Sequence, residues 1–480
     1  MSAIHVVVMA AGKGTRMKSK RPKVLHTLAG RALLRHVLDG AAALGAADVV
    51  VVTGHGATEV EAACADWSKA GGQNGSYPSL RPVRQEPQLG TGHAVQQAVP
   101  LLPQDGVTLI LNGDVPLVQP DTLRALIDLC GARQIALLTV DTAEDAGAYG
   151  RIVRGGQGAD APVLAIVEAK DATPEQRALT EWHSGVMAAP TALLKKYLAQ
   201  LDDDNAQKEF YLTDVVRHAV ADGTPVQALR ISDAVEVAGV NSPQQLAELE
   251  RELQLRTAQR FMADGVRLAD PARFDVRGEL VCGQDVEIDV GCIFEGRVAL
   301  GDDVRIGAHC VIANADIAAG AVIHPFTHID GAKDGVRVGA GALVGPFARL
   351  RPGATLGAEV HIGNFVEVKN STLADGAKAN HLAYLGDATV GERVNYGAGS
   401  ITANYDGANK HRTVIEADVH VGSNCVLVAP ITLGAGGTVG GGSTLTKSTP
   451  PGALTVARGK PVSIAHWQRP VKKAAGTNES

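Results

Sequence analysis

Aliphatic residues recur at every sixth position through the second half of the chain. A spacing of six is a multiple of the strand period of two and matches no α-helical period, so one face of each short strand stays apolar. A short fixed repeat over such a length predicts a solenoid of stacked parallel strands. Two unbroken runs carry the pattern: Val338, Val344, Leu350, Leu356, Ile362 and Val368, then Val421, Leu427, Leu433, Val439 and Leu445.

The repeat is looser outside these runs. Residues 314–336 follow it poorly, and residues 402–420 break it outright. We expect residues 402–420 to form a loop that projects from the coil. Shorter patches keep the spacing: Leu300, Ile306 and Ile312 before the first run, and Tyr384, Val390 and Tyr396 between the two runs.

The first 240 residues alternate short β-rich runs with segments whose apolar residues have helical spacing. Residues 120–130 are one such helical segment. This alternation predicts a Rossmann-like α/β domain on a mainly parallel sheet, in which ligands bind at the carboxyl ends of the strands. The runs predicted as buried strands are residues 5–9, 48–53, 107–111 and 135–140.

One long helix is predicted over residues 242–265. Ser242 suits the N-cap, Pro243 suits the first helical position, and Gln245 completes a capping-box pattern. Gly265 suits the position just beyond the helix end. We therefore expect an α/β domain over 1–241, a helical linker over 242–264, and a β-helix over 265–480 that includes a short flexible tail.

Charge and cysteine usage narrow the class of protein. The chain has 45 basic and 51 acidic residues, so it lacks the basic excess typical of proteins that bind nucleic acid. Its six cysteines show no CxxC pair and no zinc-ligand spacing, so we expect free thiols in a reducing compartment, the cytoplasm. No segment approaches the run of about 18 apolar residues that a membrane-spanning helix needs.

A glycine-rich segment, Met9-Ala10-Ala11-Gly12-Lys13-Gly14-Thr15-Arg16-Met17, follows the first predicted strand. Its small residues let a ligand approach the backbone, whose N–H groups suit phosphate oxygens. Lys13 and Arg16 add positive charge. The segment matches neither the Walker A loop nor the dinucleotide-binding fingerprint, and by itself it could be a plain turn between a strand and a helix.

Three further motifs accompany it: Pro22-Lys23, Gln88-Leu89-Gly90-Thr91-Gly92-His93-Ala94, and Asn112-Gly113-Asp114. In this order, the motifs of the first 240 residues resemble those of sugar-nucleotide pyrophosphorylases, the nucleotidyltransferases that make UDP-sugars. The resemblance implies that UTP and a sugar 1-phosphate are substrates, and that Asp114 and Asn241 hold Mg²⁺. Taken alone, Asp114 could cap a helix, and Asn241 could be a turn residue ahead of one.

The same resemblance implies the contacts to UTP and the UDP-sugar. The implied residues are Met9, Ala10, Ala11, Gly12, Arg16, Lys23, Gln85, Gly90, Thr91, Asn112, Gly113, Asp114, Gly150, Glu168, His183 and Asn241. The chain departs from the family pattern at two places. His183-Ser184 stands where Asn-Thr or Asn-Ser is usual, and Ala238 replaces a common glutamate. His183 can still donate one hydrogen bond, although its length differs from that of asparagine.

The hexad half resembles the left-handed β-helices of acyltransferases that use acetyl-CoA. Polar residues gather where the hexads falter, in segments 363–369, 380–387, 395–399 and 404–410. Over residues 3–473, the two halves together resemble a family of bifunctional enzymes. These join an N-acetylglucosamine-1-phosphate uridyltransferase to a glucosamine-1-phosphate N-acetyltransferase.

Amide formation from an amine needs a general base, because an ammonium group has no lone pair. His381 is the candidate, since imidazole titrates near neutral pH. Arg351, Lys369 and Lys410 form a cationic set suited to a sugar phosphate. The resemblance implies that Tyr384 and Asn395 also bind the amino sugar. It implies acetyl-CoA contacts at Ala398, Asn404, Tyr405, Ser423, Gly441 and Arg458, with Gly441 standing where alanine is common.

The resemblance implies two successive reactions. The enzyme would acetylate glucosamine 1-phosphate with acetyl-CoA, then transfer UMP from UTP to give UDP-N-acetylglucosamine and pyrophosphate. This product supplies peptidoglycan and lipopolysaccharide synthesis in bacteria. The family forms homotrimers through the β-helix, with small-molecule substrates, no nucleic-acid partner and no membrane insertion. Two alternatives stay open: a single-activity pyrophosphorylase whose β-helix serves regulation and assembly, and a scaffold that binds ligands without catalysis.

Overall fold

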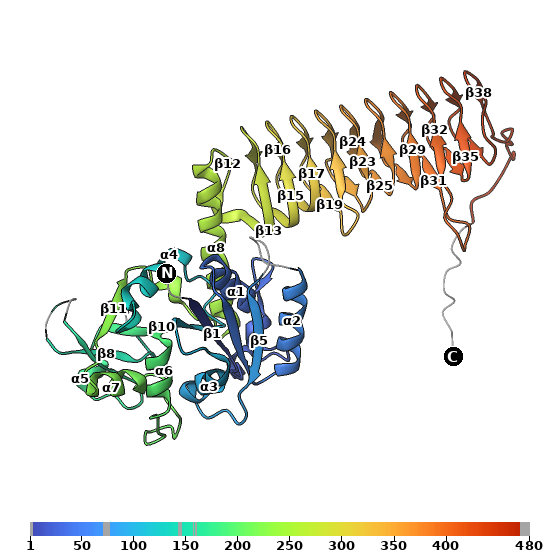
Figure 1. Cartoon of the computed structure of the whole chain (residues 1–480). Helices are drawn as coiled ribbons and strands as arrows, with labels where there is room; N and C mark the ends of the chain where they lie inside the picture. The colour runs from blue at the N-terminus through green and yellow to red at the C-terminus, as the bar shows by residue number, and fades with distance from the viewer. Residues whose placement is uncertain (1–2, 71–76, 143–145, 157, 159–160, 471–480) are drawn as a thin grey trace, which may run out of the picture. The chain divides into compact units, whose positions relative to one another are not determined.

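A computed structural model describes residues 3–70, 77–142, 146–156, 158 and 161–470 (Figure 1). The chain forms two compact units, one of residues 1–257 with 276–278, the other of residues 258–275 with 279–480. The division falls within helix α8 (Pro243–Ala263), the segment predicted to connect two domains. The domain boundaries themselves stay a prediction, and most of the predicted tail, residues 471–480, lies outside the described residues.

A mainly parallel sheet is the centre of the N-terminal unit. Its main path runs in the order β11 (Val226–Ile231), β7 (Ile135–Asp141), β10 (Glu181–Pro190), β6 (Val107–Asn112), β1 (Ile4–Ala10), β4 (Asp48–Thr53) and β5 (Ser79–Arg84). Only β10 runs antiparallel to its neighbours on this path, and it also pairs with the hairpin of β8 (Arg151–Arg154) and β9 (Val163–Val167). The predicted buried strands are confirmed within one residue at each end.

Helices cover both faces of this sheet, because its strands are apolar on both sides. One core cluster packs α1, α2 and α4 against the sheet, and a second packs α3, α6 and α7 against the opposite face. The helices are α1 (Leu33–Ala43), α2 (Ala57–Ala70), α3 (Thr91–Ala98), α4 (Pro120–Cys130), α5 (Pro174–Arg177), α6 (Thr191–Leu198) and α7 (Asp214–Ala221). Short 3-10 turns are η1 (Thr15–Met17), η2 (Lys23–Leu25), η3 (Val99–Leu101) and η4 (Ala234–Val237), and β2 (Thr27–Leu28) pairs with β3 (Arg31–Ala32).

Helix α8 begins and ends as its sequence predicts, with one change. The Ser242 hydroxyl accepts a hydrogen bond from the Gln245 N–H (3.2 Å), as an N-cap does. The Gln245 side chain accepts from the N–H of Asn241 (2.9 Å) and not from that of Ser242, so the reciprocal half of the capping box is displaced by one residue. Gly265 has φ +97°, and the Val266 N–H bonds to the Phe261 carbonyl (2.9 Å), which is a Schellman end.

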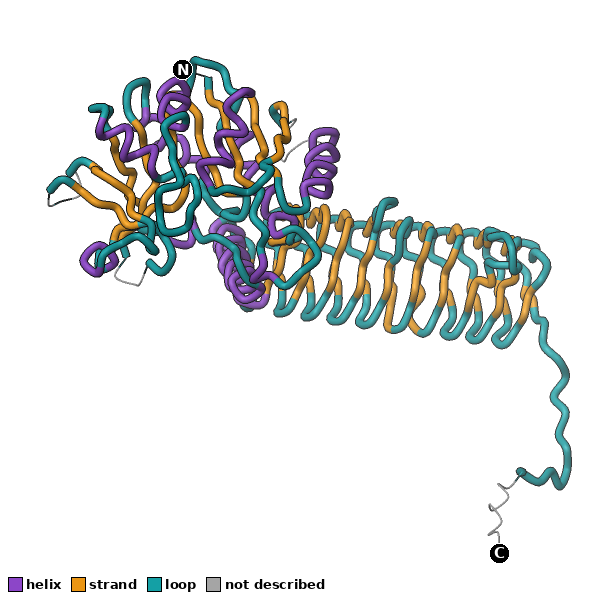
Figure 2. Tube along the Cα trace, turned by 90° about the horizontal axis from the view of Figure 1, so that it is seen from below, coloured by secondary structure: helices purple, strands orange, loops and turns teal. Residues whose placement is uncertain are grey.

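The hexads form a triangular coil of parallel strands. Val338 pairs with Leu356, and Val344 pairs with Ile362, so strands stack on residues eighteen positions apart and three hexads complete one coil. Every member of the two long runs is buried, with at most 4% of its surface exposed. The predicted parallel β-helix is therefore confirmed, and Figure 2 shows its coils stacked along one axis.

The coil has three sides, called faces A, B and C, and each is made of a stack of strands. Face A holds β12 (Arg267–Leu268), β14 (Glu287–Ile288), β16 (Arg305–Ile306), β18 (Val322–Ile323), β21 (Leu343–Val344), β24 (His361–Asn364), β27 (Lys378–His381), β30 (Asn395–Tyr396), β33 (His420–Val421), β36 (Thr438–Val439) and β38 (Leu454–Thr455). Face B holds β19 (His328–Asp330), β22 (Arg349–Leu350), β25 (Glu367–Lys369), β28 (Tyr384–Gly386), β31 (Ile401–Ala403), β34 (Val426–Val428) and β37 (Thr444–Leu445).

Face C is the third side of the coil. Its strands are β20 (Val336–Val338), β23 (Thr355–Leu356), β26 (Thr372–Leu373), β29 (Ala388–Val390), β32 (Thr413–Ile415) and β35 (Ile431–Leu433). The strand β17 (Val311–Ile317) pairs with strands of both face B and face C, and it follows the long strands β13 (Phe274–Cys282) and β15 (Cys292–Leu300). A 3-10 turn, η5 (Pro271–Arg273), precedes β13.

Two expectations about the interrupted hexads were wrong. Tyr384 does not belong to the core, because its neighbour Leu385 (0% exposed) pairs with Val368 and fills that position in a coil shortened to seventeen residues. The projecting loop is shorter than residues 402–420. Strand β31 ends at Ala403 and β32 begins at Thr413, because Ile415 resumes the buried period, so the loop is residues 404–412.

In the described part of the chain, no helix is long and apolar enough to cross a membrane. All six cysteines carry free thiols, and five of them are buried.

Candidate active sites

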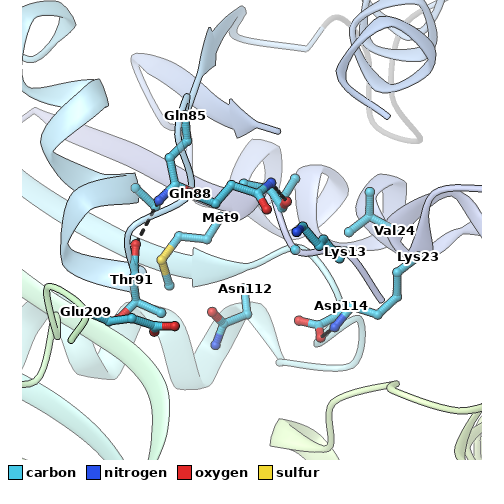
Figure 3. A pocket seen from close by; sticks show the side chains of 15 residues that line it. Met9, Lys13, Lys23, Val24, Gln85, Gln88, Thr91, Asn112, Asp114 and Glu209 are labelled. Carbon is cyan, nitrogen blue, oxygen red and sulfur yellow. Dashed lines mark hydrogen bonds and ion pairs between the residues drawn. The ribbon is translucent and has the colours of Figure 1, made fainter. Parts of the chain in front are cut away.

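A cavity of about 480 Å³ lies at the carboxyl ends of β1 and β6 (Figure 3). The two strands are adjacent, and they end at Ala10 and Asn112, so the motifs that follow them meet here. Its lining includes these predicted nucleotide contacts: Met9, Ala10, Ala11, Gly12, Lys23, Gln85, Gly90, Thr91, Asn112 and Asp114. Their convergence matches the ligand position expected of an open α/β sheet.

Hydrogen bonds hold the loops of this cavity in place. The Gln88 amide donates to the carbonyl oxygen of Ala11, and the Gln85 amide donates to the carbonyl oxygen of Gly90 (2.8 Å). Gly90 has φ +109°, and a Cβ there would lie 2.6 Å from the Phe210 carbonyl oxygen, so this position requires glycine. These contacts fix the positions of the loops that form the cavity walls.

Asp114, Asn241 and Lys23 converge on one point beside the cavity. The Lys23 ammonium donates to Asp114 Oδ2 and to Asn241 Oδ1, the latter at 3.1 Å. The Val240 N–H donates to the Asp114 carbonyl oxygen (3.0 Å), which joins the two segments. A carboxylate and an amide oxygen aimed at one cation fit Mg²⁺, which prefers such hard oxygen ligands. Asp114 caps no helix, since α4 begins at Pro120.

Arg16 and Asn241 line a neighbouring cavity of about 470 Å³. Its wall includes the rings of Tyr149 and Trp182, which stack with centroids 4.3 Å apart. Gly113 lies behind the first cavity, where its N–H donates to the Met9 carbonyl oxygen (2.9 Å).

Gly150, Glu168 and His183 form a separate group that lines neither cavity. The His183 N–H donates to the Gly150 carbonyl oxygen (2.9 Å), and a Cβ on Gly150 would lie 3.7 Å from Glu168 Oε1. Burial raises the pKa of Glu168, whose carboxylate accepts a bond from Thr213 (2.9 Å). Burial lowers the pKa of His183 to about 4, so its ring is neutral, and its Nδ1 has no hydrogen-bond partner among the described residues.

The cavity lining also includes residues that the motif comparison did not assign. Lys13, Gln88 and Ala94 belong to the recognised motifs, and Val24 follows Lys23, so neighbouring sequence could have indicated them. Glu209 had no such signal. It reaches the cavity because Phe210 exchanges backbone hydrogen bonds with Leu89 and Gly92 across the loop.

In the β-helix, the predicted base and acetyl-CoA residues stack in one column at the corner after face A. The Gly399 N–H donates to the His381 carbonyl oxygen (3.4 Å), and the Asn424 N–H donates to that of Ala398 (2.8 Å). The next coils continue this order. We name the set the acetyl column: His381, Ala398, Ser423, Gly441 and Arg458, whose guanidinium donates to the Gly441 carbonyl oxygen (3.0 Å).

The predicted cationic set gathers at the opposite edge of face B. Lys369 ends β25, Arg351 follows β22, and Lys410 arrives on the 404–412 loop. The hydrogen-bonding contact with Lys410, then partial burial and the charges of Lys410 and Arg351, lower the pKa of Lys369. Three cations held this close indicate a site for an anion.

Two carboxylates hold the 404–412 loop: Asp387 ties it to the coil, and Asp406 fixes its internal shape. Asn404 donates to the buried Asp387, and Tyr405, which is exposed, donates to the Gly407 carbonyl oxygen (2.6 Å). The backbone N–H of Asn409 and the His411 side chain hold the pKa of Asp406 well below its usual range. Lys410 is thereby carried on a loop of defined shape.

The other two amino-sugar residues lie on different faces of one chain. Tyr384 points out of face B, since Leu385 points into the core. Asn395 is exposed on face A, where its neighbour Tyr396 is buried. One chain therefore presents the predicted acetyl-transfer residues on two sides of the coil.

Comparison with known proteins assigns the two halves to known classes. Residues 6–218 match the MobA-like NTP transferase domain, and residues 335–370 match six repeats of the bacterial transferase hexapeptide. Fold and sites thus define a nucleotidyltransferase joined to a hexapeptide-repeat transferase. The chain belongs to the GlmU family of bifunctional proteins. These comparisons confirm the prediction that the chain is an enzyme with both a nucleotidyltransferase and an acetyltransferase activity.

Three relatives show how far the similarity extends. The chain is 71% identical over 477 residues to the bifunctional protein GlmU of Polaromonas sp. strain JS666, covering 98% of this chain and 99% of that one. It is 72% identical over 474 residues to that of Polaromonas naphthalenivorans, with the same coverage. It is 54% identical over 475 residues to that of Bordetella parapertussis, covering 98% and 100%.

Proposed function

We propose that the chain makes UDP-N-acetylglucosamine from glucosamine 1-phosphate in two steps, one in each half. The observation that carries this proposal is that each half of the chain holds its own set of residues with the required chemistry. Asp114, Asn241 and Lys23 converge beside the first cavity. In the β-helix, His381 begins the acetyl column at one edge of face B, and Lys369 lies at the other edge with Arg351 and Lys410. This arrangement favours two activities over a β-helix that serves regulation and assembly alone.

In the acetyl transfer, the amine nitrogen of the sugar attacks the thioester carbon of acetyl-CoA. The carbon–sulfur bond breaks, CoA leaves as the thiolate, and the amine proton passes to His381. Arg351, Lys369 and Lys410 bind the phosphate and orient the sugar. Small residues in the acetyl column, such as Ala398 and Gly441, let the pantetheine arm lie against the coil.

In the uridylyl transfer, a phosphate oxygen of the acetylated sugar attacks the α-phosphorus of UTP, and pyrophosphate leaves. Catalysis of this kind consists mainly of alignment and charge neutralisation. Asp114 and Asn241 would hold Mg²⁺, which supplies positive charge to the phosphates. Gln85 and Gly90 orient the base, while Lys13, Arg16 and Lys23 attract the triphosphate. Gly150, Glu168 and His183 are the proposed sugar contacts.

The proposed assembly is a homotrimer in the cytoplasm. Its support is the distribution of site residues, with Tyr384 on face B and Asn395 on face A of the same chain. A neighbouring copy would bring the two faces together at one site. The product would enter bacterial cell-wall and lipopolysaccharide synthesis.

An omission assay tests both steps at once. The purified protein is incubated with glucosamine 1-phosphate, acetyl-CoA, UTP and Mg²⁺, and products are followed by chromatography with mass detection. UDP-N-acetylglucosamine should form only in the complete mixture. Without acetyl-CoA it should be restored by N-acetylglucosamine 1-phosphate. Formation of a UDP-sugar without any acetylated amine would contradict the two-step proposal.

A further inference from the structure

Asn364 is the coil neighbour of His381, and it is hydrogen-bonded both to the His381 ring and to the backbone of the next residue. Strands β24 and β27 are parallel, and their register places Asn364 against His381. The Asn364 carbonyl oxygen accepts the N–H of Leu382 (3.0 Å), and its side-chain Oδ1 lies 2.9 Å from Nδ1 of His381. One residue therefore holds both the backbone beside the histidine and its ring.

This close approach depends on the residue before it. A Cβ on Gly363 would lie 1.9 Å from the Asn380 carbonyl oxygen, so no other residue type lets the two strands meet here. Val366 and Val368 then return the chain to the buried period. The side chain of Asn364 is thus directed at His381 by the coil and not by a mobile loop.

The contact selects one form of the imidazole. An amide oxygen only accepts hydrogen bonds, so Nδ1 of His381 must carry the hydrogen. In the neutral ring, Nε2 then holds the lone pair that a general base needs. On the next coil the column continues with Ala398, whose methyl group offers the ring no competing hydrogen bond.

We propose that Asn364 is a positioning residue for acetyl transfer, which keeps His381 in the Nδ1–H form with Nε2 free to accept the proton of the substrate amine. This inference rests on the proposed function of His381 as the base. In the reaction, Nε2 takes the proton as the nitrogen–carbon bond forms and the thiolate leaves. The Nδ1–H bond to Asn364 is kept throughout, and it stabilises the cationic ring.

Other titratable groups on neighbouring strands are His361 on β24, Lys378 on β27, Tyr384 on β28 and Tyr396 on β30. In the described residues, none of them is hydrogen-bonded to His381, whose ring partner is Asn364. The effect of changing Asn364 should therefore be read directly in the behaviour of this histidine.

The test compares pH profiles of acetyl transfer for Asn364→Asp and Asn364→Ala in the full-length protein. Asp keeps an acceptor but adds a negative charge that favours the protonated ring, so the acid limb should move to higher pH by about one unit. Its high-pH plateau should be retained within about threefold. Ala should lower kcat about tenfold to a hundredfold at every pH, with KM for the sugar within about twofold, because the ring loses its alignment.

Asn314→Ala is the matched control. Its Oδ1 also accepts a bond from an earlier coil, from the Arg297 N–H (3.2 Å), but it lies far along the β-helix from His381. It should lose comparable thermal stability and keep its acetyl-transfer profile. The substrate amine titrates equally in all variants, so a difference between the pH profile of a variant and that of the parent reflects a change in the enzyme.

An unshifted acid limb in Asn364→Asp would overturn the inference, and so would full kcat in Asn364→Ala. If Asn364→Ala unfolds, the pH profile of Asn364→Asp still tests the inference. Failure of the underlying function looks different, because His381→Ala would then retain acetyl transfer in the parent background. If His381→Ala loses acetyl transfer while the Asn364 variants behave like the parent, His381 is still the base, and only the positioning role of Asn364 is contradicted.

Discussion

The two candidate sites differ in how the chain assembles them. The nucleotide site draws residues from positions as distant as Lys23, Asp114 and Asn241. Asp114 follows β6, which ends beside β1, and the Val240 N–H bond to Asp114 brings Asn241 to the same edge of the sheet. The acetyl column draws residues about one coil apart, which meet because each coil stacks on the one before. A sheet brings distant segments together, while a solenoid converts sequence period into spatial neighbours.

The two sites should also be independent of each other in activity. The residues of each site belong to a different compact unit of the chain, so damage to one site should leave the other active. The largest expected effect follows from removing the proposed base.

His381→Ala should reduce acetyl transfer by about 10²–10⁴-fold, the usual contribution of a general base, while uridylyl transfer stays within about twofold. Separate assays of the two half-reactions measure this. His328→Ala, an exposed histidine on an earlier strand of face B, is the matched control and should change neither rate. Near-normal acetylation by His381→Ala would contradict the assignment of His381 as the base.

Asp114→Ala should produce the reverse pattern. Uridylyl transfer should fall about 10²–10³-fold, because an oxygen ligand for the cation that stabilises the transferring phosphate is lost. Acetyl transfer should continue. Calorimetric titration with Mn²⁺ in the presence of UTP gives a second readout, and Asp128→Ala, exposed on α4, is the control. Loss of both activities in a folded protein would break the independence of the two sites.

The finding that Leu385, and not Tyr384, fills the core of the shortened coil can be tested by changing each residue in turn. Leu385→Ala should destabilise the β-helix by about 2–5 kcal/mol, since the leucine is fully buried. Tyr384→Ala should cost less than about 1 kcal/mol and instead raise KM for the amino sugar. Denaturant unfolding and acetyl-transfer kinetics measure the two effects. Equal destabilisation by the two substitutions would show that Tyr384 also packs in the core.

The smallest expected effect concerns the 404–412 loop. Asp406→Asn should raise KM for glucosamine 1-phosphate a few-fold with little change in kcat, because the loop that carries Lys410 loses the carboxylate that fixes its internal shape. In the parent, the pKa of Asp406 is lowered, so its contribution is complete at neutral pH and is lost only as pH falls through that lowered value. Steady-state assays at neutral pH check the effect on KM. An unchanged KM would show that phosphate binding by Lys410 does not depend on these bonds within the loop.

Sequence patterns determined the architecture because both kinds of strand have a local signature. Buried parallel strands read as short apolar runs, and the hexads read as a fixed period, so Val50 and Val344 could both be assigned to cores. The motifs also located most of the nucleotide cavity. Their spacing could not show that Glu209 joins it, since that contact depends on a loop packed far away in sequence.

Tertiary structure decided what happens where the period fails. A shortened coil keeps its register by pairing Leu385 with Val368, which moves Tyr384 outward, and no local pattern separates these two residues. The same stacking sets Asn364 against His381, seventeen positions away, through strands that only glycine at 363 allows to approach. Where the period is unbroken, sequence alone determines which residues are buried, because burial follows side-chain period. The contacts between coils were settled by three-dimensional register, because hydrogen bonds between strands depend on neighbours in space.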